Sequence, residues 1–147
     1  MRRARRLRAG WVLPVAAAPI RDGADLINAG GRLAAVGPEA AVPAPLDVPV
    51  HHLPDAVLLP GLVNVHTHLE LTGFEDAVPE DDFAAWIRHL RALKQARPAE
   101  AWVALAERGL QACWAAGVTT IADTGDSGAP IEALARLGGS GVYYQEV

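Results

Sequence analysis

The sequence has a single cysteine, no long apolar run, and too little glycine and proline for a low-complexity chain, and each of these limits excludes a class of protein. A single cysteine, Cys113, cannot pair within these residues, which excludes a disulfide scaffold and favours a reducing compartment. No run of about 18 apolar residues occurs, so we predict no transmembrane helix. With 14 Gly and 11 Pro in 147 residues, the chain is no low-complexity segment. Its 51% hydrophobic and 20% charged residues indicate a globular domain.

Positive charge is concentrated at residues 2–8, where five arginines stand with no acidic residue among them, although the whole chain carries a net charge of −4. This segment lacks interleaved aromatic residues and any nucleic-acid-binding motif, so we expect no nucleic-acid partner. It also imitates a secretory signal, because an apolar run and three alanines follow it. Pro14 interrupts that run and a strand–turn pattern comes next. We therefore favour a cytoplasmic protein without a membrane partner.

The sequence pattern changes along the chain, and we predict a domain boundary between residues 55 and 56. The first part alternates short strands with turns: strands at 8–15, 24–28, 32–36 and 50–53, a turn at 18–23, and a proline-rich loop at 38–49. The second part predicts strands at 62–66, 118–122 and 141–147, and helices at 82–96, 98–116 and 131–137. This alternation of strands and helices is typical of βαβ units with a parallel sheet.

The first predicted helix has a cap and one apolar stripe. Asp81 or Asp82 can cap its N-terminus. The stripe repeats at helical spacing and consists of Phe83, Trp86, Ile87, Leu90 and Leu93. We expect Trp86, Trp102 and Trp114 to pack the helices against the sheet, and Cys113 to be a small buried apolar residue.

His66-Thr67-His68 stands at the carboxyl end of the first predicted parallel strand. Residues i and i+2 of a strand point to the same face, so the two imidazoles project together and can ligate one cation. Neutral imidazole suits zinc, iron and other first-row divalent metals. Chemistry in such sheets occurs at the carboxyl ends of the strands. We therefore predict that His66 and His68 are metal ligands.

Other polar residues near predicted strand ends have two interpretations. Glu70 either faces a substrate pocket, as the one candidate for a catalytic role, or is a solvated loop carboxylate. Asp123 either orients a ligand or, as we favour, caps the following loop. Gln145 and Glu146 either contact substrate or lie at an exposed edge. No ligand role is predicted for the remaining histidines: His51, His52 and His89.

Three segments resemble the amidohydrolase superfamily in the correct order. Residues 59–69, Leu-Pro-Gly-Leu-Val-Asn-Val-His-Thr-His-Leu, resemble its first-strand signature. Residues 30–37 resemble the hairpin that precedes its barrel, and residues 117–123 resemble its second strand. The Asn-x-His-Thr-His form is similar to the branch of cytosine deaminases, chlorohydrolases and aminofutalosine deaminases. The dihydroorotase and hydantoinase branch usually has Asp where this chain has Asn64.

The resemblance implies a (β/α)8 TIM-type barrel together with a small β-sandwich built from both chain ends. Residues 1–55 then form part of the sandwich, and residues 56–147 form about the first three β/α units. A barrel typically needs about 250 residues, so this α/β fold is incomplete as given. The resemblance also implies further histidines and an aspartate on later strands, which this sequence lacks. We therefore expect an N-terminal fragment, or an incomplete gene model, that is inactive alone.

For the full-length protein, the resemblance implies hydrolysis of a non-peptide C–N bond in a small-molecule substrate. A water activated by Zn or Fe attacks an amidine-like carbon and releases ammonia, as in deamination of a cyclic amidine or nucleoside-like base. A dehalogenating chlorohydrolase is an alternative within this class. A different alternative is a non-catalytic half-barrel that works by association. The full-length protein could form a homo-oligomer whether it is an enzyme or a non-catalytic half-barrel.

Overall fold

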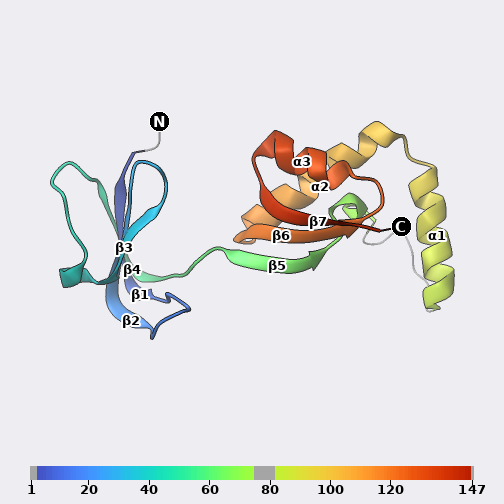
Figure 1. Ribbon diagram of the computed structural model, residues 1–147. Coiled ribbons are helices and arrows are strands. Elements are labelled where there is room, and N and C mark those ends of the chain that lie inside the picture. The colour runs from blue at the N-terminus through green and yellow to red at the C-terminus, as the bar shows by residue number, and fades with distance from the viewer. Residues whose placement is uncertain (1–2, 75–81, 147) are drawn as a thin grey trace. The chain divides into compact units, whose positions relative to one another are not determined.

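The computed structural model describes residues 3–74 and 82–146 (Figure 1). The chain divides into two compact units, with the division between Pro60 and Gly61. The predicted boundary between residues 55 and 56 falls inside strand β4 (Val50–Leu58). β4 pairs with β1 as far as Leu58, opposite Val12, and this pairing keeps residues 56–58 in the first unit.

The first unit is one four-stranded sheet in the order β3-β2-β1-β4. Its other strands are β1 (Arg5–Val12), β2 (Ile20–Ile27) and β3 (Leu33–Pro38), joined as an antiparallel meander. β4 lies parallel to β1 and follows a long connection that includes the short 3₁₀ helix η1 (Glu39–Ala41). Gly10 faces the Pro54 carbonyl so closely that a Cβ would collide with it. Glycine at this position therefore lets β1 and β4 pair beside a proline.

Two strand predictions for this unit need correction. The predicted turn at 18–23 is wrong in its second half, because Ile20 to Gly23 already pair with β1. The reversal occurs earlier, where the Ala16 N–H donates to the Pro14 carbonyl and Val15 has a positive φ of 67°. The strand predicted at 50–53 extends to Leu58. Pro54 does not end it, because the register of the β1–β4 pair shifts between Ala9 and Trp11.

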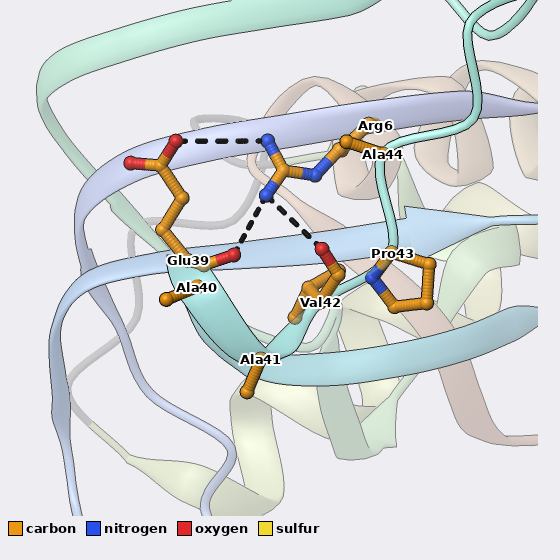
Figure 2. A pocket seen from close by; sticks show the side chains of 7 residues that line it. All are labelled: Arg6, Glu39, Ala40, Ala41, Val42, Pro43 and Ala44. Carbon is orange, nitrogen blue, oxygen red and sulfur yellow. Dashed lines mark hydrogen bonds and ion pairs between the residues drawn. The ribbon is translucent and has the colours of Figure 1, made fainter.

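A buried arginine organises the long connection before β4 (Figure 2). Arg6 on β1 is 4% exposed, and its Nη2 donates to the Glu39 carbonyl at 2.9 Å and to the Val42 carbonyl at 3.3 Å. Its Nη1 lies 3.8 Å from the Glu39 carboxylate. An open cavity of about 650 Å³ adjoins this arginine. The arginine's partners all belong to one turn, so its role is to hold that turn.

The second unit contains a three-stranded parallel sheet in the order β5-β6-β7. Its strands are β5 (Leu62–Thr67), β6 (Val118–Gly125) and β7 (Ser140–Gln145). The helices α2 (Ala99–Ala115) and α3 (Ala129–Leu137) lie on the same side of this sheet (Figure 1). Between them a buried cluster holds Leu69, Ala106, Leu110, Ile121 and Ala133. The predicted order of strands and helices in this unit is confirmed.

Helix α1 (Phe83–Gln95) begins as one of the two predicted caps requires. The Asp82 carboxylate accepts from the backbone N–H groups of Ala84 and Ala85, while Asp81 lies outside the described residues. Leu90 packs in a second cluster with Phe74, Trp102, Leu105 and Ala129, and Trp86 and Leu93 lie against it. Phe83 does not join this cluster and is 73% exposed. The apolar stripe of α1 is therefore only partly used for packing.

The predicted burial of single residues is confirmed in part. Trp102 is buried and Trp86 half-buried, but Trp114 is 37% exposed. Cys113 is half-buried against the first cluster, and burial raises the pKa of its thiol. In the described parts of the chain, no helix has both the length and the apolarity needed to cross a membrane.

Candidate functional site

The two histidines at the carboxyl end of β5 are neighbours in space. The ring centroids of His66 and His68 lie 4.9 Å apart, with the ring planes at 89°. His66 is exposed and His68 is half-buried. The His66 backbone N–H donates to Oδ1 of Asn64 at 3.2 Å, which ties the strand end to its own side chain. Both imidazoles therefore stand together at the sheet edge where α/β proteins place their chemistry.

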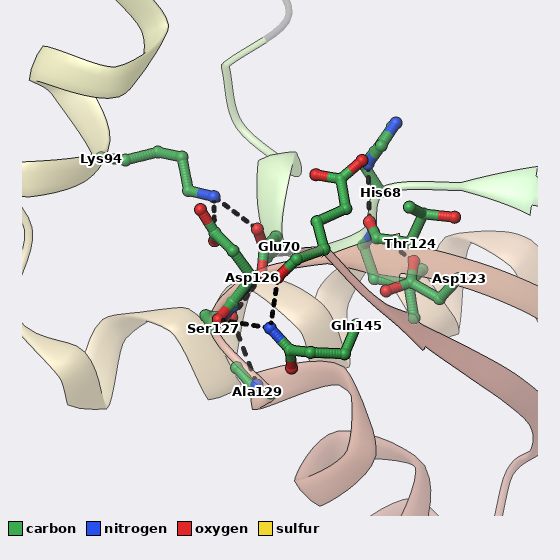
Figure 3. Close-up of polar contacts among 12 residues, drawn as sticks. His68, Glu70, Lys94, Asp123, Thr124, Asp126, Ser127, Ala129 and Gln145 are labelled. Atoms are coloured by element: carbon green, nitrogen blue, oxygen red, sulfur yellow. Dashed lines mark hydrogen bonds and ion pairs between the residues drawn. The ribbon is translucent and has the colours of Figure 1, made fainter.

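The tautomer of His68 follows from its hydrogen bond. Its Nδ1 lies 2.6 Å from the Thr124 carbonyl oxygen at the end of β6 (Figure 3). A carbonyl can only accept, so Nδ1 carries the proton and donates it. In the neutral ring, Nε2 then keeps its lone pair. This backbone contact is the kind that orients metal-binding histidines in proteins.

The two histidines do not by themselves make a complete metal site. Within residues 3–74 and 82–146, no group of three or more His, Cys, Asp or Glu side chains is arranged to hold a metal ion. Catalytic zinc usually has three protein ligands and one open position. Two imidazoles could supply part of such a ligand set, and the described residues do not supply the rest.

Asp123 holds the chain directly after His68. This residue lies within β6 and is fully buried, and its Oδ1 accepts from the Leu69 N–H at 2.7 Å. Oδ2 has no partner among the described residues. Desolvation raises the pKa of this carboxyl from 3.8 to about 6; the Leu69 hydrogen bond opposes the rise and the Glu70 charge adds to it. The interpretation of Asp123 as a cap of the following loop is wrong, because its partner lies after β5.

Glu70 is buried, so its interpretation as a solvated loop carboxylate is wrong. It lies in the short 3₁₀ helix η2 (Leu69–Leu71) and is 1% exposed. Its Oε1 accepts from Nζ of Lys94 at 2.5 Å, and its Oε2 accepts from the hydroxyl and the N–H of Ser127 (Figure 3). A Cβ at Gly125 would come within 2.9 Å of the carboxylate. Glycine there makes room for this carboxylate beside β6.

Lys94 on α1 joins two acidic residues. Its Nζ also donates to Oδ1 of Asp126 at 2.5 Å. Burial alone would lower the pKa of Lys94, but the hydrogen bonds and charges of Asp126 and Glu70 raise it. The same contact lowers the pKa of Asp126. Sequence reasoning missed Lys94, Asp126 and Ser127. One signal was available, because Lys94 continues the apolar stripe four residues after Leu90.

The end of β7 closes the same group of loops. Gln145 Nε2 donates to the Asp126 carbonyl at 3.1 Å and to the Glu146 carbonyl at 2.9 Å. The Glu146 N–H donates to the Gly125 carbonyl at 2.8 Å. Both side chains are exposed.

The other three histidines stand on other elements. His51 and His52 lie on β4 of the first unit, and His89 lies on an exposed part of α1.

A cavity of about 400 Å³ lies between α1 and the strand ends. His68, Glu70 and Lys94 line its polar side, and Phe83, Trp86 and Leu90 line its apolar side. Its volume lies within the range of about 300–1,000 Å³ that is usual for small-molecule sites. The candidate site thus combines two imidazoles, a rigid ion-paired carboxylate and a pocket beside them.

Comparison with known proteins identifies the family. The model of the amidohydrolase family matches residues 57–143, more than half of the chain. The chain therefore belongs to the amidohydrolase family, and the resemblance seen in its sequence is confirmed. No curated protein matches it.

Solved structures share the fold. An adenosine deaminase from Xanthomonas campestris with bound zinc matches with a TM-score of 0.80 at 24% identity. The matched region covers 92% of this chain and 32% of the deaminase chain. The zinc complex of atrazine chlorohydrolase TrzN from Arthrobacter aurescens TC1 has a TM-score of 0.80 at 21% identity, covering 95% and 35%. Helicobacter pylori aminofutalosine deaminase, in complex with methylthio-coformycin, has a TM-score of 0.79 at 16% identity, covering 97% and 35%. This chain spans about a third of the length of each.

Proposed function

We propose that this chain supplies the first metal-binding strand of a hydrolase that cleaves non-peptide C–N bonds. The observation that carries the proposal is the contact of His68 Nδ1 with the Thr124 carbonyl, which leaves Nε2 free to ligate. His66 stands beside it at the same strand end. Membership of the amidohydrolase family supports the reaction class, and the zinc in two similar structures supports a divalent ion, Zn or Fe.

In this proposal the chain's residues divide the work. His66 and His68 bind the ion, the Thr124 carbonyl orients His68, and Asp123 fixes the backbone at Leu69. When bound, the ion supplies a Lewis acid that makes water more acidic. Glu70 is saturated by Lys94 and Ser127, so it acts as a positioning residue rather than as a proton carrier. The general acid–base group must then lie outside the residues described.

We propose deamination of a cyclic amidine or nucleoside-like small molecule as the specific reaction. Water forms a new C–O bond, and one of its protons goes to the amidine nitrogen that stays. Its other proton goes to the amino group, which leaves as ammonia when the C–N bond breaks. The adenosine and aminofutalosine deaminases among the similar structures support this choice. The similar chlorohydrolase supports the second candidate, displacement of chloride by the same water.

We further propose that β5, β6 and β7 are the first three strands of a (β/α)8 barrel and that the first unit is part of a β-sandwich. The parallel strand order and the matching third of longer structures support this assignment. A barrel would surround the strand ends and bring further ligands to His66 and His68.

Metal binding tests the proposal on the chain itself. Equilibrium dialysis against zinc, and against ferrous iron without oxygen, would compare the unmutated 147-residue chain, called the parent from here on, with the variant His66→Ala/His68→Ala. We expect the double variant to bind at least about tenfold more weakly. The matched control is His51→Ala/His52→Ala, which also removes two histidines and should bind like the parent. Equal affinity of the parent and the His66→Ala/His68→Ala variant would reject the ligand assignment.

A further inference from the structure

The sheet of the first unit has one covered face and one open face. On the covered face Arg8 donates to the Glu39 carboxylate at 2.6 Å, and Ala24, which stands opposite Arg8, is fully buried. On the open face Leu33 and Val36 of β3 are 57% and 40% exposed. Apolar side chains left open on one face of a sheet indicate that a further layer packs over them.

Asp25 stands on this open face without a partner. Its neighbours across the sheet are Leu7 on β1 and Val36 on β3, and opposite residues of antiparallel strands point to the same face. Its Oδ1 is buried and has no hydrogen-bond partner among the described residues. Desolvation raises the pKa of this carboxyl. A carboxylate among apolar side chains costs free energy until a cation or a hydrogen-bond donor compensates it.

A small apolar cavity adjoins Asp25. It measures about 240 Å³, and Val12, Leu58 and Leu59 are among its apolar walls. The described residues that line it include no lysine and no arginine. Its volume lies below the range of about 300–1,000 Å³ that is usual for small-molecule sites, which favours an incoming side chain over a free ligand.

The chemistry of the cavity selects one kind of side chain. A carboxylate requires a cation, and apolar walls require an aliphatic stem. Lysine supplies both, and its ammonium has three donors to satisfy, whereas the guanidinium of arginine has five. Asp25 is the one ionisable residue among those that line the cavity, so the smaller donor set is the better match.

We propose that a lysine side chain, carried by a polypeptide segment that packs over the open face, enters this cavity and pairs with Asp25. The inference rests on the proposal that the first unit is part of a β-sandwich, and it needs neither the histidines of β5 nor a metal ion. A segment without the cation would bury the Asp25 carboxylate unpaired, so Asp25 selects which segment covers the sheet and in which register.

Three small probes test the requirement for an ammonium: butylamine, butanol and butyrate. Butylamine has the stem and the charge of a lysine side chain, butanol lacks the charge, and butyrate reverses it. Each would be titrated into the metal-free parent at pH 7 and constant ionic strength, with the methyl signals of Val12 and Val36 followed by NMR. We expect butylamine to bind about tenfold more tightly than butanol, and butyrate more weakly than both. The Leu110 methyl signals in the second unit should not shift.

A pair of variants on β2 assigns the effect to one carboxylate. Asp25→Asn keeps the shape of the side chain and removes a desolvated charge, so it should fold and should bind butylamine no better than butanol. Asp22→Asn is the matched control, because Asp22 is an exposed acid of the same strand, and it should keep the preference. Equal affinity of the parent for butylamine and butanol, or a preference that survives Asp25→Asn, would overturn the ion pair.

Two peptides test whether the lysine arrives on a segment. Acetyl-Thr-Val-Lys-Val-Thr-amide should bind the parent at least about tenfold more tightly than butylamine, because its valines add contacts with the open face. The same peptide with methionine in place of lysine should lose most of this affinity. A lysine peptide no better than butylamine, or a methionine peptide equal to it, would overturn the proposal.

Failure of this inference can be told apart from failure of the proposed function. If the methionine peptide binds as well as the lysine peptide, the open face still takes a covering segment and only the pairing of Asp25 is wrong. If neither peptide binds more tightly than butylamine, the assignment of the first unit to a sandwich loses its support as well. Zinc binding at His66 and His68 is measured separately and is unaffected by either result.

Discussion

Each unit of the chain buries a charged side chain, and the two are used differently. Arg6 in the first unit is 4% exposed and Glu70 in the second is 1% exposed. Arg6 donates to carbonyls of a single turn and pairs weakly with Glu39. Glu70 is held by Lys94 from α1 and Ser127 from the loop after β6. The first charge stabilises a local turn, whereas the second joins three segments around the histidines.

This difference has a physical basis. A buried charge must be compensated, and the cost of losing a partner depends on whether water can replace it. The carbonyls that Arg6 binds border an open cavity, so water can reach them once the guanidinium is removed. The Glu70 side chain is only 2% exposed, so water cannot readily replace a lost partner of its carboxylate. Removing the cation that pairs with Glu70 should therefore cost more than removing Arg6.

The largest effect is expected for Lys94→Met. This change keeps the apolar stem but leaves the buried Glu70 carboxylate with Ser127 alone, and should lower the free energy of unfolding by about 2–4 kcal/mol. Denaturant unfolding followed by tryptophan fluorescence measures it. The double variant Glu70→Gln/Lys94→Met removes the stranded charge and should recover part of the loss. A double variant no more stable than Lys94→Met would show that charge burial is not the cause.

The second effect concerns pH and Asp123. Its pKa is raised from 3.8 to about 6 in the folded chain. The folded state therefore holds this proton more tightly than the unfolded state, and the resulting stability is present below about pH 4 and lost as pH rises through 6. In the parent, the free energy of unfolding should fall by up to about 3 kcal/mol over this range from this carboxyl.

Asp123→Asn should lack this loss, so the stability difference between variant and parent should shift in favour of the variant between pH 4 and pH 7. Urea unfolding with a chelator present measures it on the metal-free chain. Ionisations that are common to both proteins largely cancel in the difference. A difference that stays constant with pH would contradict the assignment of a raised pKa to Asp123.

The sequence predicted the second unit better than the first. Each predicted helix and strand of the second unit is present because helical stripes, caps and glycine stops act locally, as Asp82, Gly117 and Gly138 show. The first unit depends on pairing between distant segments. Pro54 stands inside β4 only because Gly10 makes room for it on β1, and no local pattern signals that contact.

The same division applies to the candidate site. The spacing of His66 and His68 indicated two neighbouring imidazoles, and the structure places the rings 4.9 Å apart; their role as ligands stays a prediction. The surroundings of Glu70 could not be predicted, since Lys94 and Ser127 are 24 and 57 residues away in sequence. Long-range polar contacts leave no periodic signal, and only the charge of Lys94 on an apolar stripe hinted at one.

A smaller effect is expected for Arg6→Met in the first unit. The variant leaves the Glu39 and Val42 carbonyls without their donor, at a cost of about 1–2 kcal/mol because the open cavity lets water bind them. Hydrogen exchange of the residues around η1 should increase, while exchange in β5–β7 stays unchanged. A loss equal to that of Lys94→Met would remove the contrast between the two buried charges.

The smallest effect is expected for Arg136→Ala, which tests whether burial or mere pairing decides the cost. Arg136 pairs with Glu132 one turn earlier on α3 and with Glu107 at 3.6 Å, but its side chain is 57% exposed. Exposed pairs of this kind contribute about 0–0.5 kcal/mol and weaken with salt. The variant should therefore unfold like the parent in 0.5 M salt, a concentration of about three times the physiological ionic strength. Because Arg136, like Lys94, has two acidic partners, a cost near that of Lys94→Met would mean that the number of partners, not burial, sets the energy of these clusters.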